Sequence, residues 1–157
     1  DNFYIVRGVI CLIILPESCL AEPIIKSDNR TFDITKGIYD LQGHVFVQFP
    51  VKDVPITITG DTTQVYVYQQ EIHGAGNIKL AFDDINFTCD KVDVYPKEKL
   101  AYLKGNLFFN DKQLTITSTA GKYCWQNKLA TFEGNIKVNG KPQGNFLQYN
   151  IATHSII

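Results

Sequence analysis

The chain has 157 residues, of which 45% are hydrophobic and 20% charged, so its size and composition are those of one folded domain. Its 15 basic and 16 acidic residues give a formal net charge of −1. No basic stripe with interleaved aromatic residues accompanies this balance, so the sequence argues against an electrostatic grip on nucleic acid. We therefore expect no nucleic-acid partner.

The first 21 residues differ from the rest and are typical of a signal peptide. Arg7 precedes an apolar run over residues 8–15, and small residues stand at the −3 and −1 positions of a cleavage site after Ala21. A membrane-spanning helix needs roughly 20 apolar residues, and a Pro-Glu pair interrupts this run well before that length. We predict cleavage after Ala21 and an exported domain over residues 22–157. A retained N-terminal anchor is the alternative.

The rest of the chain is built from a repeated unit of 22 residues. Four copies align without a gap, at residues 23–44, 56–77, 85–106 and 114–135. Each copy ends on a glycine followed by His or Asn, and these glycines follow one another at 33, 29 and 29 residues: Gly43, Gly76, Gly105 and Gly134. A period of this size indicates a repeat architecture. Length differences confined to the connections are typical of loops.

Within each unit the hydrophobic period is two residues, which predicts strands that bury one face. Residues at even offsets from the glycine are apolar or small, such as Ile78 and Leu80, and those at odd offsets are mainly polar, such as Lys79. Two shorter strands precede the glycine strand, for example at residues 85–88 and 92–95. We expect an all-β fold made of repeats of about 29 residues, with no helix within them.

The repeated glycine falls in the middle of a strand on the inward phase, as at Gly76 and Gly105. Glycine in such a place normally costs stability, so it indicates a sharp bend or a close approach of another backbone. We interpret the Gly-Asn pairs as corners of the fold and not as a binding site.

Cys89 and Cys124 remain after removal of the first 21 residues, and a cysteine pair in an exported protein invites a disulfide. Cys89 falls on the inward phase, whereas Tyr123 and Trp125 take the inward phase on either side of Cys124. The two thiols are therefore expected to face opposite sides of the sheet. A bridge between them would need a change of phase at a bend.

No arrangement of residues for catalysis, metal binding or cofactor binding stands out. His44, His73 and His154 lie in different units, without the spacing of metal ligands or of a nucleophile and its base. We interpret each as a solvated strand histidine. Asp61 and the pair at residues 83–84 lie in turns, where Asp commonly bonds the backbone. We predict that the protein is not an enzyme and has neither metal nor cofactor.

The inward residues form an apolar interior, which can be a plain packed core or can open slightly and hold an apolar ligand. A packed core is the simpler interpretation for any one residue. The candidate lipid-binding residues are Phe82, Phe87, Leu103, Leu107, Phe109, Ile116, Phe132, Ile136 and Val138.

The last segment, residues 146–157, begins another unit, because Tyr149 and Ile151 align with Phe32 and Ile34. This copy stops before its Gly-Asn pair. A repeat array without a polar cap leaves unpaired strand edges at its ends, so these four residues mark the predicted assembly edges. Head-to-tail contact between copies would give open rods and not rings.

Residues 27–45, followed by the recurring Gly-Asn-Ile/Leu strands, resemble the OstA-like domain of the LptA family of lipopolysaccharide transport proteins. The resemblance covers residues 22–157. It implies a folded-over antiparallel sheet, a β-jellyroll, whose apolar groove shields the acyl chains of lipopolysaccharide (lipid A) in the periplasm. It also implies head-to-tail homo-oligomers that link LptC-like inner-membrane and LptD-like outer-membrane partners. His44, which replaces Asn, and the incomplete last unit depart from the pattern.

Three alternatives stay open. The domain could belong to an LptC-like component with a retained membrane helix, or to the amino-terminal part of a longer outer-membrane assembly protein. It could also be an enzyme or carbohydrate-binding protein on a β-solenoid, which would need clustered carboxylates or exposed aromatic residues in consecutive units. Tyr66, Tyr95 and Tyr102 come nearest to this requirement, but they do not occupy one repeat position.

Overall fold

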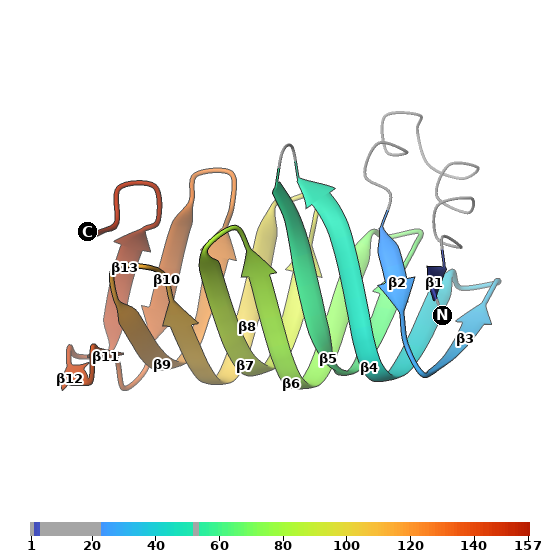
Figure 1. The fold of residues 1–157 in the computed structure, drawn as a ribbon, viewed down its shortest axis with the longest axis horizontal. Helices are drawn as coiled ribbons and strands as arrows, with labels where there is room; N and C mark the ends of the chain where they lie inside the picture. The colour runs from blue at the N-terminus through green and yellow to red at the C-terminus, as the bar shows by residue number, and fades with distance from the viewer. Residues whose placement is uncertain (1, 4–22, 52–53) are drawn as a thin grey trace.

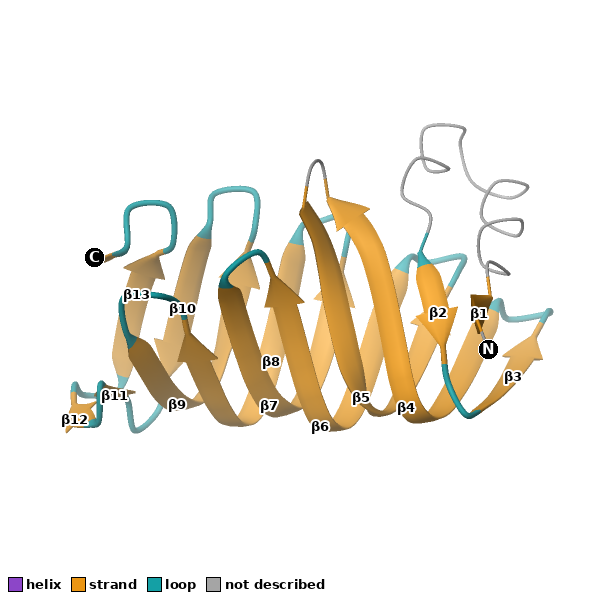
Figure 2. Cartoon of the chain, in the orientation of Figure 1, coloured by secondary structure: helices purple, strands orange, loops and turns teal. Residues whose placement is uncertain are grey.

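The computed structural model describes residues 2–3, 23–51 and 54–157. This part of the chain forms one antiparallel sheet of 14 strands and contains no helix (Figure 2). Most of the predicted signal peptide, residues 4–21, lies outside the described residues. Within the described ranges, no helix has the length and apolar character needed to cross a membrane.

The strands follow one another along the chain with short connections. Their bounds are β1 (Asn2–Phe3), β2 (Ile24–Lys26), β3 (Asn29–Asp33), β4 (Ile38–Val51), β5 (Val54–Tyr66), β6 (Glu71–Phe82), β7 (Ile85–Tyr95), β8 (Leu100–Asn110), β9 (Thr115–Cys124), β10 (Leu129–Glu133), β11 (Lys137–Val138), β12 (Lys141–Pro142), β13 (Phe146–Asn150) and β14 (Ser155–Ile156).

Strands that are neighbours in sequence are mostly neighbours in the sheet. From β4 to β10 the chain runs as an antiparallel meander, and β13 and β14 continue it beyond β10. At the other end, β4 pairs with β2 along one half and with β3 along the other. Consecutive units pair as antiparallel hairpins, so the architecture is a folded-over antiparallel sheet and not the β-solenoid of the third alternative.

The long strands bend once, at a bulge that contains the repeated glycine. Gly76 and Asn77 of β6 lie opposite a single residue, Asp90, between the register pairs on either side. Both have positive φ, 84° for Gly76 and 49° for Asn77. An extra residue in one strand bends it and increases its twist, so these bulges fold the sheet over along one long side (Figure 1). The predicted corners are confirmed.

Side-chain bonds fix each corner. Asn77 Nδ2 donates to Asp61 Oδ2 at 2.9 Å, and Asn106 and Asp90 form the same bond at 2.9 Å in the next unit. A Cβ on Gly76 would lie 2.7 Å from Asp61 Oδ2. It would therefore point at an exposed carboxylate, so the prediction that the glycine faces inward is wrong. The bulge changes the phase at this position.

The two shorter strands predicted in each unit are the halves of one bent strand. Residues 85–88 and 92–95, for example, both belong to β7. Two exposed residues follow each other at the corner, between buried Cys89 and buried Val92. The alternation is interrupted there, so one strand resembles two in the sequence. In the fourth unit the strand is interrupted at residues 134–136, after which β11 pairs with β9 and forms a small hairpin with β12.

The bends divide the sheet into two layers, the front and back layers in the view of Figure 1. The back layer contains β3, β10, β13 and the other halves of the long strands. The front layer contains β2, β11 and residues 45–51, 54–60, 78–82, 85–89, 107–110 and 115–118.

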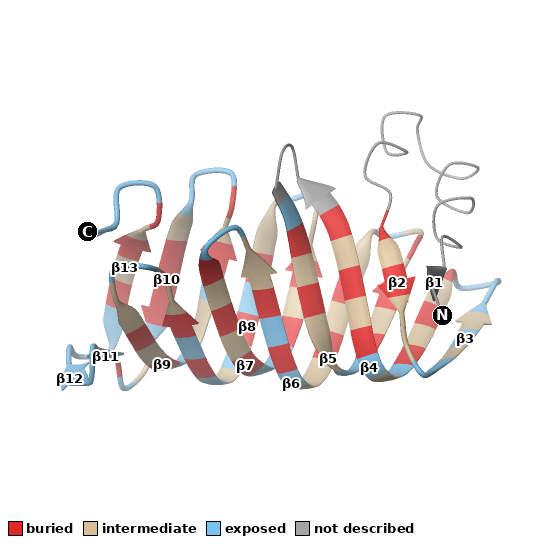
Figure 3. Cartoon of the chain, in the orientation of Figure 1, coloured by how far each residue is buried: buried red, intermediate tan, exposed pale blue. Residues whose placement is uncertain are grey.

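Buried and more exposed residues alternate along the long strands, because each layer turns one face toward the other (Figure 3). The inward side chains of the two layers join in one hydrophobic core. The predicted all-β, folded-over antiparallel sheet is thus confirmed.

Candidate functional site

The predicted lipid-binding residues all lie at the interior between the two layers. Phe82 and Val138 are partly buried and pack against the core. The other seven are 0–1% exposed: Phe87, Leu103, Leu107, Phe109, Ile116, Phe132 and Ile136. The alternation of the sequence is therefore sufficient to identify the residues that line the interior.

Aromatic rings fill the middle of this interior and connect the layers. Phe109 of the front layer lies 5.7 Å from Phe132 and 5.6 Å from Tyr149, both in the back layer, measured between ring centroids. Phe87 lies 4.9 Å from Phe109 and 5.5 Å from Tyr123. Such tilted ring pairs stabilise a packed core beyond the area that they bury.

In this arrangement the interior is closed. Because the seven innermost candidates have almost no exposed surface, an acyl chain can reach them only if the layers separate and the chain replaces contacts between side chains. The bulges join the layers along one long side, so separation must begin on the opposite side, which we call the mouth (Figure 1).

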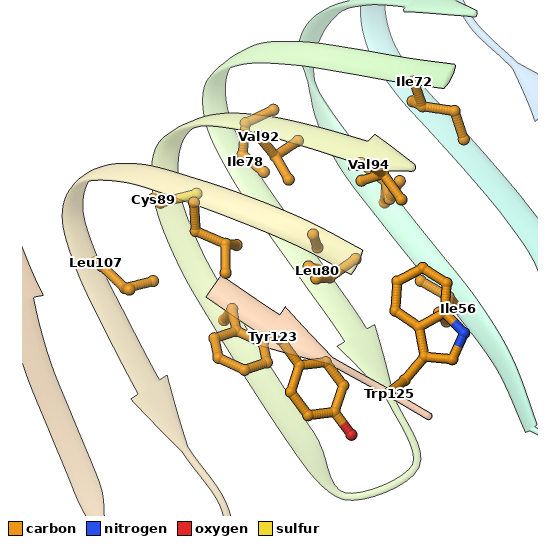
Figure 4. Close-up of a cluster of buried hydrophobic side chains, with 14 of the residues drawn as sticks. Ile56, Ile72, Ile78, Leu80, Cys89, Val92, Val94, Leu107, Tyr123 and Trp125 are labelled. Carbon is orange, nitrogen blue, oxygen red and sulfur yellow. The ribbon is translucent and has the colours of Figure 1, made fainter. Parts of the chain in front are cut away.

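Apolar rings close part of the mouth. Trp125, at the end of β9 in the back layer, lies 6.3 Å from Phe49 in the front layer. Phe82 of the front layer lies 5.0 Å from Tyr123. Figure 4 shows the Trp125 ring near Ile56, the register partner of Phe49. An alkyl chain can substitute for contacts of this kind without leaving a polar group unpaired.

A polar cluster closes another part of the mouth, toward the C-terminal end of the sheet. Asp111 begins the front-layer turn after β8, and its side chain is only 1% exposed. Its Oδ2 accepts a hydrogen bond from the hydroxyl of Tyr149 at 2.7 Å and lies 3.1 Å from Nδ1 of His154. Its Oδ1 accepts from the backbone N–H groups of Gln113 at 2.7 Å and Leu114 at 3.0 Å. We call Asp111, Tyr149 and His154 the mouth cluster.

Hydrogen bonds stabilise the negative charge of Asp111 in the mouth cluster. Burial alone would raise the pKa of the Asp111 carboxyl, but the bonds from Tyr149, Leu114, Gln113 and His154 outweigh it, so the pKa lies below the usual value. Burial and the neighbouring Asp111 carboxylate raise the pKa of the Tyr149 hydroxyl. The carboxylate therefore remains ionised and the phenol protonated at neutral pH.

Another cluster of titratable groups lies on the outer face of the back layer. Nδ1 of His73 is 2.6 Å from Asp93 Oδ1, and its Nε2 is 3.1 Å from Glu71 Oε1. The tyrosine rings of Tyr66 and Tyr95 lie 5.2 and 5.9 Å from the imidazole, each nearly perpendicular to it. The imidazole thus occupies the space between the rings and carboxylates.

The interpretation of the histidines as solvated strand residues is incomplete, because each imidazole lies within hydrogen-bond distance of at least one carboxylate. His44 Nδ1 lies 2.7 Å from Asp28 Oδ2 at the first corner, and His154 belongs to the mouth cluster. Their partners are 16 and 43 residues away in the sequence. Strand register and the fold-over bring these partners together, so spacing in the sequence could not reveal them.

The cysteines face opposite sides, as their phases predict. Cys89 is buried and Cys124 partly exposed, and both are free thiols. Burial raises the pKa of the Cys89 thiol to about 11, so it is protonated at neutral pH. Across the ranges that the structure describes, no group of three or more His, Cys, Asp or Glu side chains could hold a metal ion.

The predicted assembly edges differ in exposure. Ile34 is 74% exposed, whereas Phe32 is partly buried and stacks on Tyr39 with ring centroids 4.2 Å apart. Tyr149 and Ile151 are buried in the core. Phe146, at the start of β13, is 60% exposed, whereas the alignment of units points to Tyr149, which takes the buried phase of that strand.

The chain matches no family model and no curated protein in sequence. Its fold is similar to a solved structure of LptH, described as the LptA-homologous periplasmic component of the conserved lipopolysaccharide transport device from Pseudomonas aeruginosa. The TM-score is 0.65, and the match covers 74% of this chain and 92% of LptH at 12% identity. At this identity the likeness shows that the two proteins share a fold.

Proposed function

We propose that the protein is a periplasmic component of lipopolysaccharide transport that binds the acyl chains of lipid A between its two layers. The observation that carries this proposal is the continuous apolar interior, which is joined by bends along one side and has a mouth along the other. LptH, which shares this fold, is described as a component of a lipopolysaccharide transport device.

The physical basis is the burial of acyl chains. Each methylene group that moves from water into an apolar interior contributes about 0.8 kcal/mol of favourable free energy. An acyl chain is therefore more stable between the layers than in the aqueous periplasm. The sugars would stay outside the mouth, where polar residues of the turns meet water. Binding requires no covalent step, and the proposal assigns no catalytic residue, cofactor or metal.

Transport also needs contacts with neighbours. We propose that copies join head to tail and that the ends of such rods meet LptC-like and LptD-like partners in the inner and outer membranes. Exposed Ile34 at one end and Phe146 at the other supply apolar surface for these contacts. An LptC-like protein with a retained anchor, or a longer assembly protein, would use the same interior and stays an alternative.

Photocrosslinking in cells that make lipopolysaccharide tests this proposal. A photoreactive amino acid replaces Phe109, which is inside, or Lys137, which is exposed on β11. We expect adducts with lipopolysaccharide from position 109 and none from position 137. Absence of adducts from position 109 in a folded, exported protein would show that the interior is an ordinary packed core. The similarity to LptH would then concern the fold and not lipid binding.

A further inference from the structure

The two layers meet at the mouth through contacts of different chemistry. The pairs Phe49–Trp125 and Phe82–Tyr123 are contacts between rings. The mouth cluster instead joins an ionised carboxylate to a phenol and an imidazole. An entering acyl chain can take the place of a ring, but it offers no donor to Asp111.

The position of Asp111 makes this difference important. Its side chain is 1% exposed although it lies in a turn, and both of its oxygens accept hydrogen bonds. If the Tyr149 hydroxyl moved away, the buried Asp111 carboxylate would lose one of its hydrogen-bond donors, and the free energy of the protein would rise. Tyr149 is itself fully buried in the back layer and touches Phe109 of the front layer. The bond therefore spans the interface at the point where the aromatic interior reaches the mouth.

The two back-layer partners are held with different strength. Tyr149 is in β13, which pairs with β10 through five register pairs. His154 lies in the turn between β13 and β14, and β14 is held by two register pairs. Tyr149 is thus anchored within the sheet and His154 in a short terminal hairpin, and both side chains hold Asp111.

We propose that Asp111, Tyr149 and His154 form a latch that keeps the mouth closed at the C-terminal end of the sheet. This inference rests on the proposed function, because a latch matters only if the interior admits a ligand. Apolar contacts elsewhere along the mouth yield to an acyl chain directly, whereas this end opens only when Tyr149 and Asp111 part. The latch biases entry toward the part of the mouth closed by Phe49 and Trp125.

Hydrogen exchange on the Tyr149→Phe variant tests the latch without any lipid. The variant removes the hydroxyl and keeps the ring that packs on Phe109. We expect amides of residues 111–114 and 151–157 to exchange roughly ten- to a hundredfold faster, the range that corresponds to one hydrogen bond to a charged group. Exchange in the middle of β6 and β7 should not change, because the layers part locally. Unchanged exchange at residues 111–114 would overturn the latch.

Two further variants keep the test decisive. Tyr66→Phe also removes one hydroxyl, which bonds Gln64 at 3.3 Å on the outer face, and it should leave residues 111–114 unaffected. If Tyr149→Phe does not fold, His154→Ala replaces it, because His154 is partly exposed and its loss leaves the core intact. Faster exchange at residues 111–114 in His154→Ala supports the latch, and wild-type exchange there contradicts it.

A second readout separates the latch from the proposed function. Dansyl-labelled dodecanoic acid is titrated into the wild type and Tyr149→Phe, and its fluorescence reports entry into an apolar site. Tighter binding by the variant, by roughly tenfold, supports both proposals. Faster exchange without binding of the acid by either protein supports the latch and counts against a lipid-binding interior.

Discussion

At the scale of single residues, a glycine and the side chain opposite it decide where each strand bends. Gly76 has a φ of 84°, and the carboxylate of Asp61 fills the space where a Cβ would be. Asn77 tolerates its own positive φ and donates a hydrogen bond to the same carboxylate. The repeated Gly-Asn pair is therefore required by two separate constraints, backbone conformation and close approach.

Substitution of glycine by alanine separates these constraints. Gly140, in the turn between β11 and β12, has a similar φ of 83° but no atom within 4 Å of an added Cβ. We expect Gly140→Ala to lower the free energy of unfolding by about 1 kcal/mol, the cost of the left-handed conformation. Gly76→Ala should cost about 1–2 kcal/mol more, because Asp61 must also move. Urea denaturation measures both, and equal losses would contradict the role of Asp61.

His73 makes stability depend on pH. Burial alone would lower the pKa of its imidazole, but the bonds to Asp93 and Glu71 raise it above the usual value of 6.5. The folded state therefore binds a proton more tightly than the unfolded state, and this stabilisation is complete below about pH 6.5. It is lost as the pH rises through the pKa of the folded protein.

The His73→Gln variant tests this dependence. We expect the free energy of unfolding of the wild type to fall between pH 6 and pH 8 by more than that of the variant, because only the wild type loses the proton of His73. The variant should still show some decrease, because His44 titrates in both proteins. Chemical denaturation at a series of pH values gives the comparison. A parallel pH dependence in the two proteins would show that His73 does not carry a proton more tightly in the folded state.

At the scale of elements, the alternation of apolar residues is enough to predict the sheet. The inward phase of β6 and β8 is read directly from residues such as Ile78 and Leu107, and both are buried. Length differences between units correctly indicate the connections. The sequence misleads at the corners, where the bulge shifts the phase and makes one bent strand look like two.

The candidate site is only partly predictable for the same reason. Which residues face the interior follows from local alternation, so the lining of the core could be predicted. Whether the interior is open or closed depends on how the two layers pack after the fold-over. The contacts of Asp111 with Tyr149 and of His73 with Asp93 depend on register and layer packing, which bring together residues 38 and 20 positions apart.

The edge strands provide a test of head-to-tail assembly. Ile34 lies at the β3 end of the sheet and Phe146 on β13 at the other end, and both are exposed. We expect Ile34→Lys and Phe146→Lys each to abolish self-association measured by sedimentation, because each variant has one damaged end. A mixture of the two variants should form dimers and nothing longer. The intact end of one variant can join the intact end of the other, and both remaining ends are then damaged.

The mixture also identifies the other outcome. If the contact were between two equal surfaces, one variant would remain fully associated alone and the mixture would show no new species. Phe108→Lys, at an exposed apolar position on β8, which lies between β7 and β9 within the sheet, serves as the control for added charge. Association of this control should match that of the wild type.

At the scale of the whole molecule, two layers joined along one side form a clamp with an apolar interior. Its closed state is stabilised by the aromatic contacts around Phe109 and by the bond between Asp111 and Tyr149. Binding an acyl chain must exchange these contacts for contacts with methylene groups. The free energy of binding is therefore a difference between two large and similar terms, and small changes at the mouth will alter it strongly.

The single tryptophan provides the most direct measurement of this claim. Trp125 is the only tryptophan of the chain and lies at the mouth against Phe49. Dodecanoic acid with bromine at the end of its chain quenches tryptophan on contact, whereas the unbrominated acid does not and serves as the control. The account predicts saturable quenching of Trp125 by the brominated acid only. Binding detected by calorimetry without quenching would place the lipid outside the two layers and contradict the account.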